Sequence, residues 1–227
     1  MSSQMLSSTD GRAWVDLSHR LVDDLPRVAT FPAPRYSRFL SMPEHPLNVT
    51  HVDMVVHVGT HVDAPCHFID GGPAIDDLGV DRFTGPGIVC RVQAADLEVY
   101  GPEALADREA IEAGDIVLLE TGWSRYFRTE RYDQHPSLSV ELAHWLVDRG
   151  VKMIALDTPT PDLPVHVRPE GFTWPVHQVL LRAGVLIAEH VTNVAPLSGR
   201  RVEAVFTPLN IGGADGAPVR ALARPLS

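Results

Sequence analysis

Residues 57–68 of this chain read HVGTHVDAPCHF, which places three imidazoles and one carboxylate within eleven residues. Imidazole nitrogen and carboxylate oxygen together suit the borderline divalent ions zinc, manganese and iron(II). A single histidine is more often a core or surface residue than a ligand, whereas several matched side chains in step indicate a metal site. We therefore predict that this stretch binds a divalent ion.

The spacing of these side chains also predicts the shape of the backbone. His57, His61 and Asp63 share parity, so an extended chain points all three to one face. A helix would turn Asp63 away from the histidines, and Gly59 and Pro65 disfavour a helix. A straight strand would hold the two histidine Cα atoms about 13 Å apart, and Gly59 can adopt the bend or bulge that closes this gap. We predict a strand that kinks at Gly59 and the residue after it and brings the three side chains to one ion.

The pattern H-x-G-T-H-x-D-x-P-x-H-F closely resembles the signature of the cyclase-like metal-dependent hydrolases, the group that contains bacterial kynurenine formamidase. The likeness covers nearly the whole chain. It includes an opening strand, a post-helix segment that ends in D-T-P, a late His/Glu pair and a closing G-x-D-G-x-P-x-R segment. In this sequence these features are residues 14–18, residues 156–159, His177 with Glu189, and residues 212–220.

The resemblance implies a dinuclear metal centre. Asp63 and Glu189 would bridge two ions, with His57 and His61 on one ion and His177 on the other. Carboxylates suit bridging because each has two oxygens, whereas a neutral imidazole offers one lone pair. The expected cofactor is a divalent metal, zinc or manganese, with one or two ions per chain.

His67 is the candidate proton-transfer group. It lies shortly after Asp63, and imidazole has a pKa suited to general acid/base chemistry near neutral pH. In the family that the chain resembles, the matching histidine is the general acid/base and not a ligand, and this is the catalytic role we predict. The alternative is that His67 is a further metal ligand.

One departure from the family concerns the substrate. Kynurenine formamidases resemble one another in a T-x-W-P-G-D stretch, whose Trp contacts the substrate. Residues 30–34 here read TFPAP, so an aromatic side chain is kept while Trp, Gly and Asp are absent. We predict that Phe31 binds the substrate. A cyclic imide, an isatin or a lactone fits as well as N-formylkynurenine.

Composition sets the class of protein. The 227 residues are 44% hydrophobic and 21% charged, which predicts a single globular domain over residues 1–227. The net charge of −10 argues against nucleic acid or an anionic membrane as partner. Residues 1–11 are polar and lack the apolar region of a signal peptide, so we expect them to be disordered and the protein to be cytoplasmic. We also expect a small-molecule substrate and a homo-oligomer, a dimer or a tetramer.

The order of apolar segments and turn residues predicts an α/β fold, with a mixed sheet or partly closed barrel and flanking helices. The resemblance implies the swivelling β/β/α type. The five prolines in residues 20–48 indicate a long loop. We expect strands at residues 14–18, 49–57, 87–93, 115–121, 151–157, 185–189 and 202–209. We expect helices at residues 102–113, from an N-cap at Ser139 to Gly150, and at residues 175–182.

The function predicted from these features is hydrolysis of a small amide, cyclic amide or lactone by metal-activated water. One alternative is a non-haem iron(II) oxygenase, because His61 and Asp63 with a distant His177 mimic a 2-His-1-carboxylate site. Such oxygenases are typically jelly rolls, and the alternation of strands and helices argues against one. A second alternative is a non-catalytic metal-containing binding protein, which would need the ligands but not His67.

Overall fold

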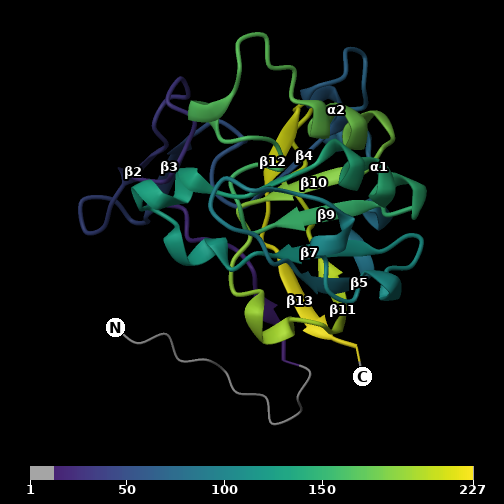
Figure 1. The fold of residues 1–227 in the computed structure, drawn as a ribbon. Helices are drawn as coiled ribbons and strands as arrows, with labels where there is room; N and C mark the ends of the chain where they lie inside the picture. Colours follow the sequence, from purple (N-terminus) through teal and green to yellow (C-terminus); the bar gives the residue numbers. More distant parts are fainter. Residues whose placement is uncertain (1–12, 227) are drawn as a thin grey trace.

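The computed structural model describes residues 13–226, so the predicted disorder of residues 1–11 lies outside the described residues. A curled, nine-stranded mixed sheet forms the body of the molecule, in the order β1-β13-β11-β5-β7-β9-β10-β4-β12 (Figure 1). Its strands, in chain order, are β1 (Val15–Asp16), β4 (His61–Asp63), β5 (Thr84–Arg91), β7 (Ile116–Glu120), β9 (Met153–Leu156), β10 (Leu186–Glu189), β11 (Arg201–Val205), β12 (Gly216–Pro218) and β13 (Leu222–Pro225). The predicted α/β class with a mixed, partly closed sheet is confirmed.

The centre of the sheet is parallel and its two flanks are antiparallel. β5, β7, β9 and β10 run in the same direction, which is the result expected when helical or looped crossovers join successive strands. β4 and β12 continue the sheet antiparallel to β10, and β11, β13 and β1 continue it antiparallel to β5.

Side chains of the central strands alternate between two hydrophobic clusters. In β7, Ile116 and Leu118 pack on one face, while Val117 and Leu119 pack on the other. The face that contains Val117 is covered by α1 (Val140–Asp148) and α2 (Pro175–Arg182), which lie together on one side of the sheet (Figure 1). Apolar side chains of the curled outer strands close over the opposite face.

Both α-helices begin and end where the sequence predicts. The Ser139 hydroxyl accepts a hydrogen bond from the Leu142 amide at 3.0 Å, and Gly150, at φ +71°, follows the last turn of α1. α2 begins at Pro175, a position where proline loses no helical hydrogen bond, and Gly184 follows it at φ +77°. No helix in residues 13–226 is long and apolar enough to cross a membrane.

Two predicted segments were wrong. Residues 102–113 are not an α-helix but two short 3-10 turns, Pro102–Ala104 and Arg108–Ala110, because Asp107 between them takes a left-handed conformation at φ +59°. Residues 20–48 are not a loop throughout, since β2 (Arg35–Leu40) pairs with β3 (Val49–Asp53) in a hairpin beside the main sheet (Figure 1). All five prolines fall outside β2, so its amide groups remain free to pair. A second two-stranded sheet pairs β6 (Val99–Tyr100) with β8 (Ser137–Leu138) in parallel.

Candidate metal centre

β4 carries the centre of the histidine string. Gly59, at φ +69°, bends the chain just before β4, as predicted, but the expected single kinked strand was wrong, because β3 ends at Asp53 and belongs to another sheet. The strand then pairs His61 with Glu189 of β10, which sets their side chains next to each other on one face. Asp63 lies on the same face, two residues along, whereas Val62 between them packs into the core.

His177 reaches this face from the first turn of α2. Its orientation is fixed by Asp162, whose carboxylate accepts a hydrogen bond from His177 Nδ1 at 2.6 Å. The same carboxylate accepts the amides of Val176 and His177 at 3.1 Å each, so it also caps the helix. Nε2 is therefore the nitrogen that His177 presents to the centre. No sequence pattern indicated this contact between Asp162 and the imidazole.

Four of the predicted ligands form a closed ring of donor atoms, which we call the donor ring: His61, Asp63, His177 and Glu189. His61 Nε2 lies 3.3 Å from Asp63 Oδ1 and 3.5 Å from Glu189 Oε2. His177 Nε2 lies 3.6 Å from Asp63 Oδ2 and 3.4 Å from Glu189 Oε1. Each carboxylate therefore turns one oxygen to His61 and the other to His177.

The donor ring fits a metal ion better than a hydrogen-bond network. Its contacts exceed the usual N–H···O range of about 2.7–3.2 Å. They lie near the edge of about 3.3 Å that separates ligands of a tetrahedral zinc with bonds of about 2.0 Å. His61 Nε2 is buried and has no hydrogen-bond partner within the described part of the chain, although it faces two carboxylates. A bound cation would satisfy this atom.

The charges of the donor ring also call for a cation. Asp63 and Glu189 are 1% and 7% exposed, and within residues 13–226 every ion pair that they make is with a histidine. Burial, together with the charge of Asp63, raises the pKa of Glu189. Burial opposes ionisation of Asp63 as well, but the neighbouring imidazoles of His177 and His57 hold its pKa well below the usual range. A divalent ion would offset both buried charges.

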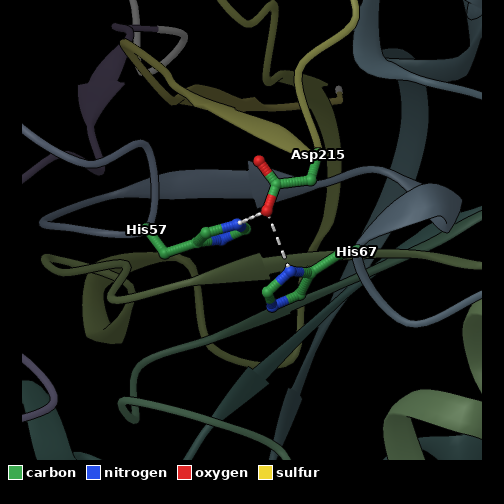
Figure 2. A group of neighbouring side chains, drawn as sticks. All are labelled: His57, His67 and Asp215. Atoms are coloured by element: carbon green, nitrogen blue, oxygen red, sulfur yellow. Dashed lines mark hydrogen bonds and ion pairs between the residues drawn. The ribbon is translucent and has the colours of Figure 1, made fainter. Parts of the chain in front are cut away.

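His57 and His67 lie at the side of the donor ring and share the carboxylate of Asp215 (Figure 2). His57 Nδ1 contacts Asp63 Oδ1 at 2.9 Å, and its Nε2 contacts Asp215 Oδ2 at 2.8 Å. Burial lowers the pKa of His57, but hydrogen bonds to Asp215 and Asp63 outweigh it and raise the pKa to about 10. Burial lowers the pKa of His67 to about 4, so this ring is neutral at pH 7.

The structure thus brings all six predicted polar site residues together, and their individual roles stay predictions. It adds Asp215 and also His190, which directly follows Glu189. A ring nitrogen of His190 lies within 4.8 Å of ligand atoms of His61 and Glu189. Its Nδ1 contacts the Tyr132 hydroxyl at 2.9 Å. The histidine directly after Glu189 was visible in the sequence, but nothing in the pattern distinguished it from a core residue.

Phe31 lies apart from these contacts, in the segment before β2. Its amide donates to the Val28 carbonyl at 2.9 Å, and its carbonyl accepts from Arg27 Nε at 3.2 Å. The side chain is partly buried. A contact between Phe31 and the substrate stays a prediction.

Known structures share this fold over their whole length. Isatin hydrolase A from Labrenzia aggregata, bound to benzyl benzoate, superposes with a TM-score of 0.83 at 23% identity, covering 96% of this chain and 95% of that one. Isatin hydrolase A from Ralstonia solanacearum gives a TM-score of 0.81 at 21% identity, covering 99% and 100% of the two chains. Fold and site therefore define the class: a curled-sheet α/β protein with a buried cluster of histidines and carboxylates that could hold a metal ion.

The family follows from sequence similarity. The family described as putative cyclase matches residues 15–163. Kynurenine formamidase from Bacillus thuringiensis (strain Al Hakam) is 31% identical over 217 residues, covering 94% of this chain and 98% of that protein. The chain belongs to the cyclase family, and the predictions of this family and of a hydrolase are confirmed.

Proposed function

We propose that this chain is a metal-dependent hydrolase that cleaves a cyclic amide or a lactone. The donor ring carries this proposal, because it brings two imidazoles and two carboxylates together, and one of its nitrogens, His61 Nε2, is buried with no hydrogen-bond partner among residues 13–226. The similarity to kynurenine formamidase over nearly the full length of both chains supports the hydrolysis of a C–N bond. The position of His67 beside the donor ring favours catalysis and not simple metal storage, because a storage site needs no acid/base group.

The chain's own residues divide the chemistry between them. A bound divalent ion supplies hydroxide near neutral pH, by lowering the pKa of water toward about 7, and polarises the substrate carbonyl. Asp63 and Glu189 offset the cationic charge. His61 and His177 would each present Nε2 to the ion, because Nδ1 of His61 donates to the Gly59 carbonyl and Nδ1 of His177 donates to Asp162. His67, with 23% of its side chain exposed, would take up the proton that the attacking water brings and pass it to the leaving nitrogen or oxygen.

We propose two ions per chain, zinc or manganese. The support is the orientation of the carboxylates: Asp63 and Glu189 each direct one oxygen to His61 and the other to His177. This is the arrangement of a bridging carboxylate. His57 would complete the ligands on the side of His61, as the resemblance implies, because its Nδ1 faces the same Asp63 oxygen as His61 Nε2.

We propose a ring-opening substrate over N-formylkynurenine. The support is Phe31, which stands where kynurenine formamidases carry the Trp of T-x-W-P-G-D. The proposed preference for a cyclic amide or lactone therefore rests on the sequence around Phe31.

The oxygenase alternative loses its structural support. The four parallel strands and the helices on one face differ from a jelly roll, which is a double antiparallel sheet. The non-catalytic alternative is tested directly by turnover.

We further propose a homo-oligomer, dimer or tetramer, that acts in the cytoplasm. Apolar side chains on and around the β2–β3 hairpin support assembly: Phe39 is 72% exposed, and Met42 and Val52 are 56% and 54% exposed. Cys66 and Cys90 are free thiols, as is usual in a reducing compartment. Light scattering of the purified protein measures the assembly, and a monomer would contradict it.

A hydrolysis screen tests the proposed function. Metal-loaded protein is assayed on N-formylkynurenine, cyclic imides and lactones, then stripped with chelator and reloaded with zinc or manganese. We expect a higher kcat/KM for a cyclic substrate, loss of activity with chelator and recovery on reloading. His61→Ala should be inactive, whereas His144→Ala, an exposed histidine of α1, should match the wild type. Absence of turnover above background on every substrate would refute a hydrolase.

A further inference from the structure

Asp215 is a half-exposed carboxylate to which the sequence pattern gave no role. It directly precedes β12, and one of its oxygens, Oδ2, faces two imidazoles (Figure 2). The distances are 2.8 Å to His57 Nε2 and 3.2 Å to His67 Nδ1. A single acceptor atom thus joins a predicted metal ligand to the predicted acid/base.

The backbone around Asp215 is held in place on both sides. The Ala64 amide donates to the Asp215 carbonyl at 2.9 Å, and β12 pairs with β4 directly afterwards. Before it, Asp76 accepts the Gly213 amide at 2.8 Å, and the Ile75 amide donates to the Ala214 carbonyl at 2.9 Å. The carboxylate is therefore presented from a fixed position and can orient the rings that it contacts.

This contact decides which nitrogen of His67 carries the hydrogen. A carboxylate only accepts hydrogen bonds, so the Asp215 contact selects the tautomer with hydrogen on Nδ1. Nε2 is then the nitrogen left for the substrate. The rings of His57 and His67 stack with centroids 3.8 Å apart and planes 24° from parallel, which limits the rotation of His67 further.

We infer that Asp215 is a positioning residue: it holds His67 in the Nδ1–H tautomer with Nε2 facing the reacting bond. The inference rests on the proposed function of the same site. The alternative is that Asp215, His57 and His67 are ligands of another metal ion. Their ligand atoms lie within 4.8 Å of one another, which this alternative would require. The 2.8 and 3.2 Å contacts are hydrogen-bond lengths, shorter than those of the donor ring.

The test uses Asp215→Asn and Asp215→Ala with Asp70→Asn as the control, since Asp70 is an exposed carboxylate shortly after the histidine string. Each variant is measured for metal content and for kcat and KM on two substrates, an unactivated amide and an ester with a good leaving group. A good leaving group needs no proton from His67. Long-range ¹⁵N–¹H spectra of histidine-labelled protein report the tautomer of His67, and His67→Ala identifies its signal.

We expect both Asp215 variants to keep their metal. In Asp215→Ala, kcat for the amide should fall about 10–100-fold, with KM and ester hydrolysis changed little, and the Nδ1–H signal of His67 should weaken or shift. The control should match the wild type. Loss of metal in the variants, equal loss on amide and ester, or an unchanged His67 tautomer would each overturn the inference. If the wild type hydrolyses nothing, the proposed function fails, and the tautomer spectra alone still decide whether Asp215 positions His67.

Discussion

Gly216→Ala tests how closely β12 approaches the metal centre. Gly216 pairs with Asp63 across β12 and β4. A Cβ at this position would lie 2.7 Å from the Val62 carbonyl oxygen and 2.9 Å from His57 Cε1, closer than Cβ atoms are found in real proteins. The conflict is steric and does not come from a left-handed backbone. The absence of a side chain at Gly216 is what lets His57 lie between Asp63 and Asp215.

The size of the effect follows from what has to move. The Val62 carbonyl belongs to a buried strand, so relief requires β12 to separate from β4 or the His57 ring to leave its position. Overpacking of this kind costs about 1–3 kcal/mol. In a chain of this size each kcal/mol lowers Tm by about 2–4 °C. We expect a fall of about 2–12 °C in the metal-free protein, and weaker metal binding because His57 is displaced.

Thermal unfolding of metal-free protein, followed by a metal competition titration, measures both effects. Gly212→Ala is the matched control, because a Cβ there would meet only Asp76 Oδ2 at 3.8 Å, an ordinary contact, and the backbone is not left-handed. We expect this control to unfold near the wild-type temperature. If the Gly216→Ala protein has the same Tm and metal affinity as Gly212→Ala, β12 does not crowd His57.

Three further changes have defined outcomes. Asp162→Ala removes the acceptor that orients His177 and caps α2, so metal affinity should fall about 10–100-fold and stability by about 1 kcal/mol; an unchanged affinity in competition titration would exclude this role. His67→Ala should keep its metal by elemental analysis while kcat falls about 10²–10⁴-fold, and loss of metal would make His67 a ligand. Burial lowers the pKa of His135 to about 4, below its usual 6.5, so the unfolded state takes up the proton first and stability falls as pH drops from about 6.5 to 4. At pH 5 this protonation should lower the free energy of unfolding, measured with urea, by about 2 kcal/mol relative to neutral pH. His135→Gln should therefore lose less stability than the wild type between pH 7 and 5. An equal loss in both proteins would contradict the lowered pKa of His135.

The parts of the site that could be predicted from sequence are those set by local geometry. Parity placed His61 and Asp63 on one face, and Gly59 marked the turn before them. The same holds for α1, where Ser139 and Gly150 act within a few residues of the helix ends. In each case the decisive interaction spans only a few positions, so the sequence contains it directly.

The parts that could not be predicted depend on pairing between distant segments. Asp215 contacts a histidine 158 positions away, and only the β12–β4 register brings it there. Asp162 reaches His177 across a loop whose path no pattern indicates. The helix expected at residues 102–113 does not form, and the reason is local. Asp107 takes a left-handed conformation that the composition of the segment does not reveal. Strand β2 was hidden by prolines that all lie outside it.

Counting the metal ions tests the central claim, that the donor ring holds the ions on which hydrolysis depends. Chelator-stripped protein is reloaded with zinc or manganese, freed of excess metal and analysed for ions per chain, with hydrolysis measured on the same samples. We expect close to two ions in the wild type, one in His177→Ala, and activity that rises with occupancy. A wild type that retains no more metal than His61→Ala, or that hydrolyses its substrate equally well when metal-free, would contradict the claim.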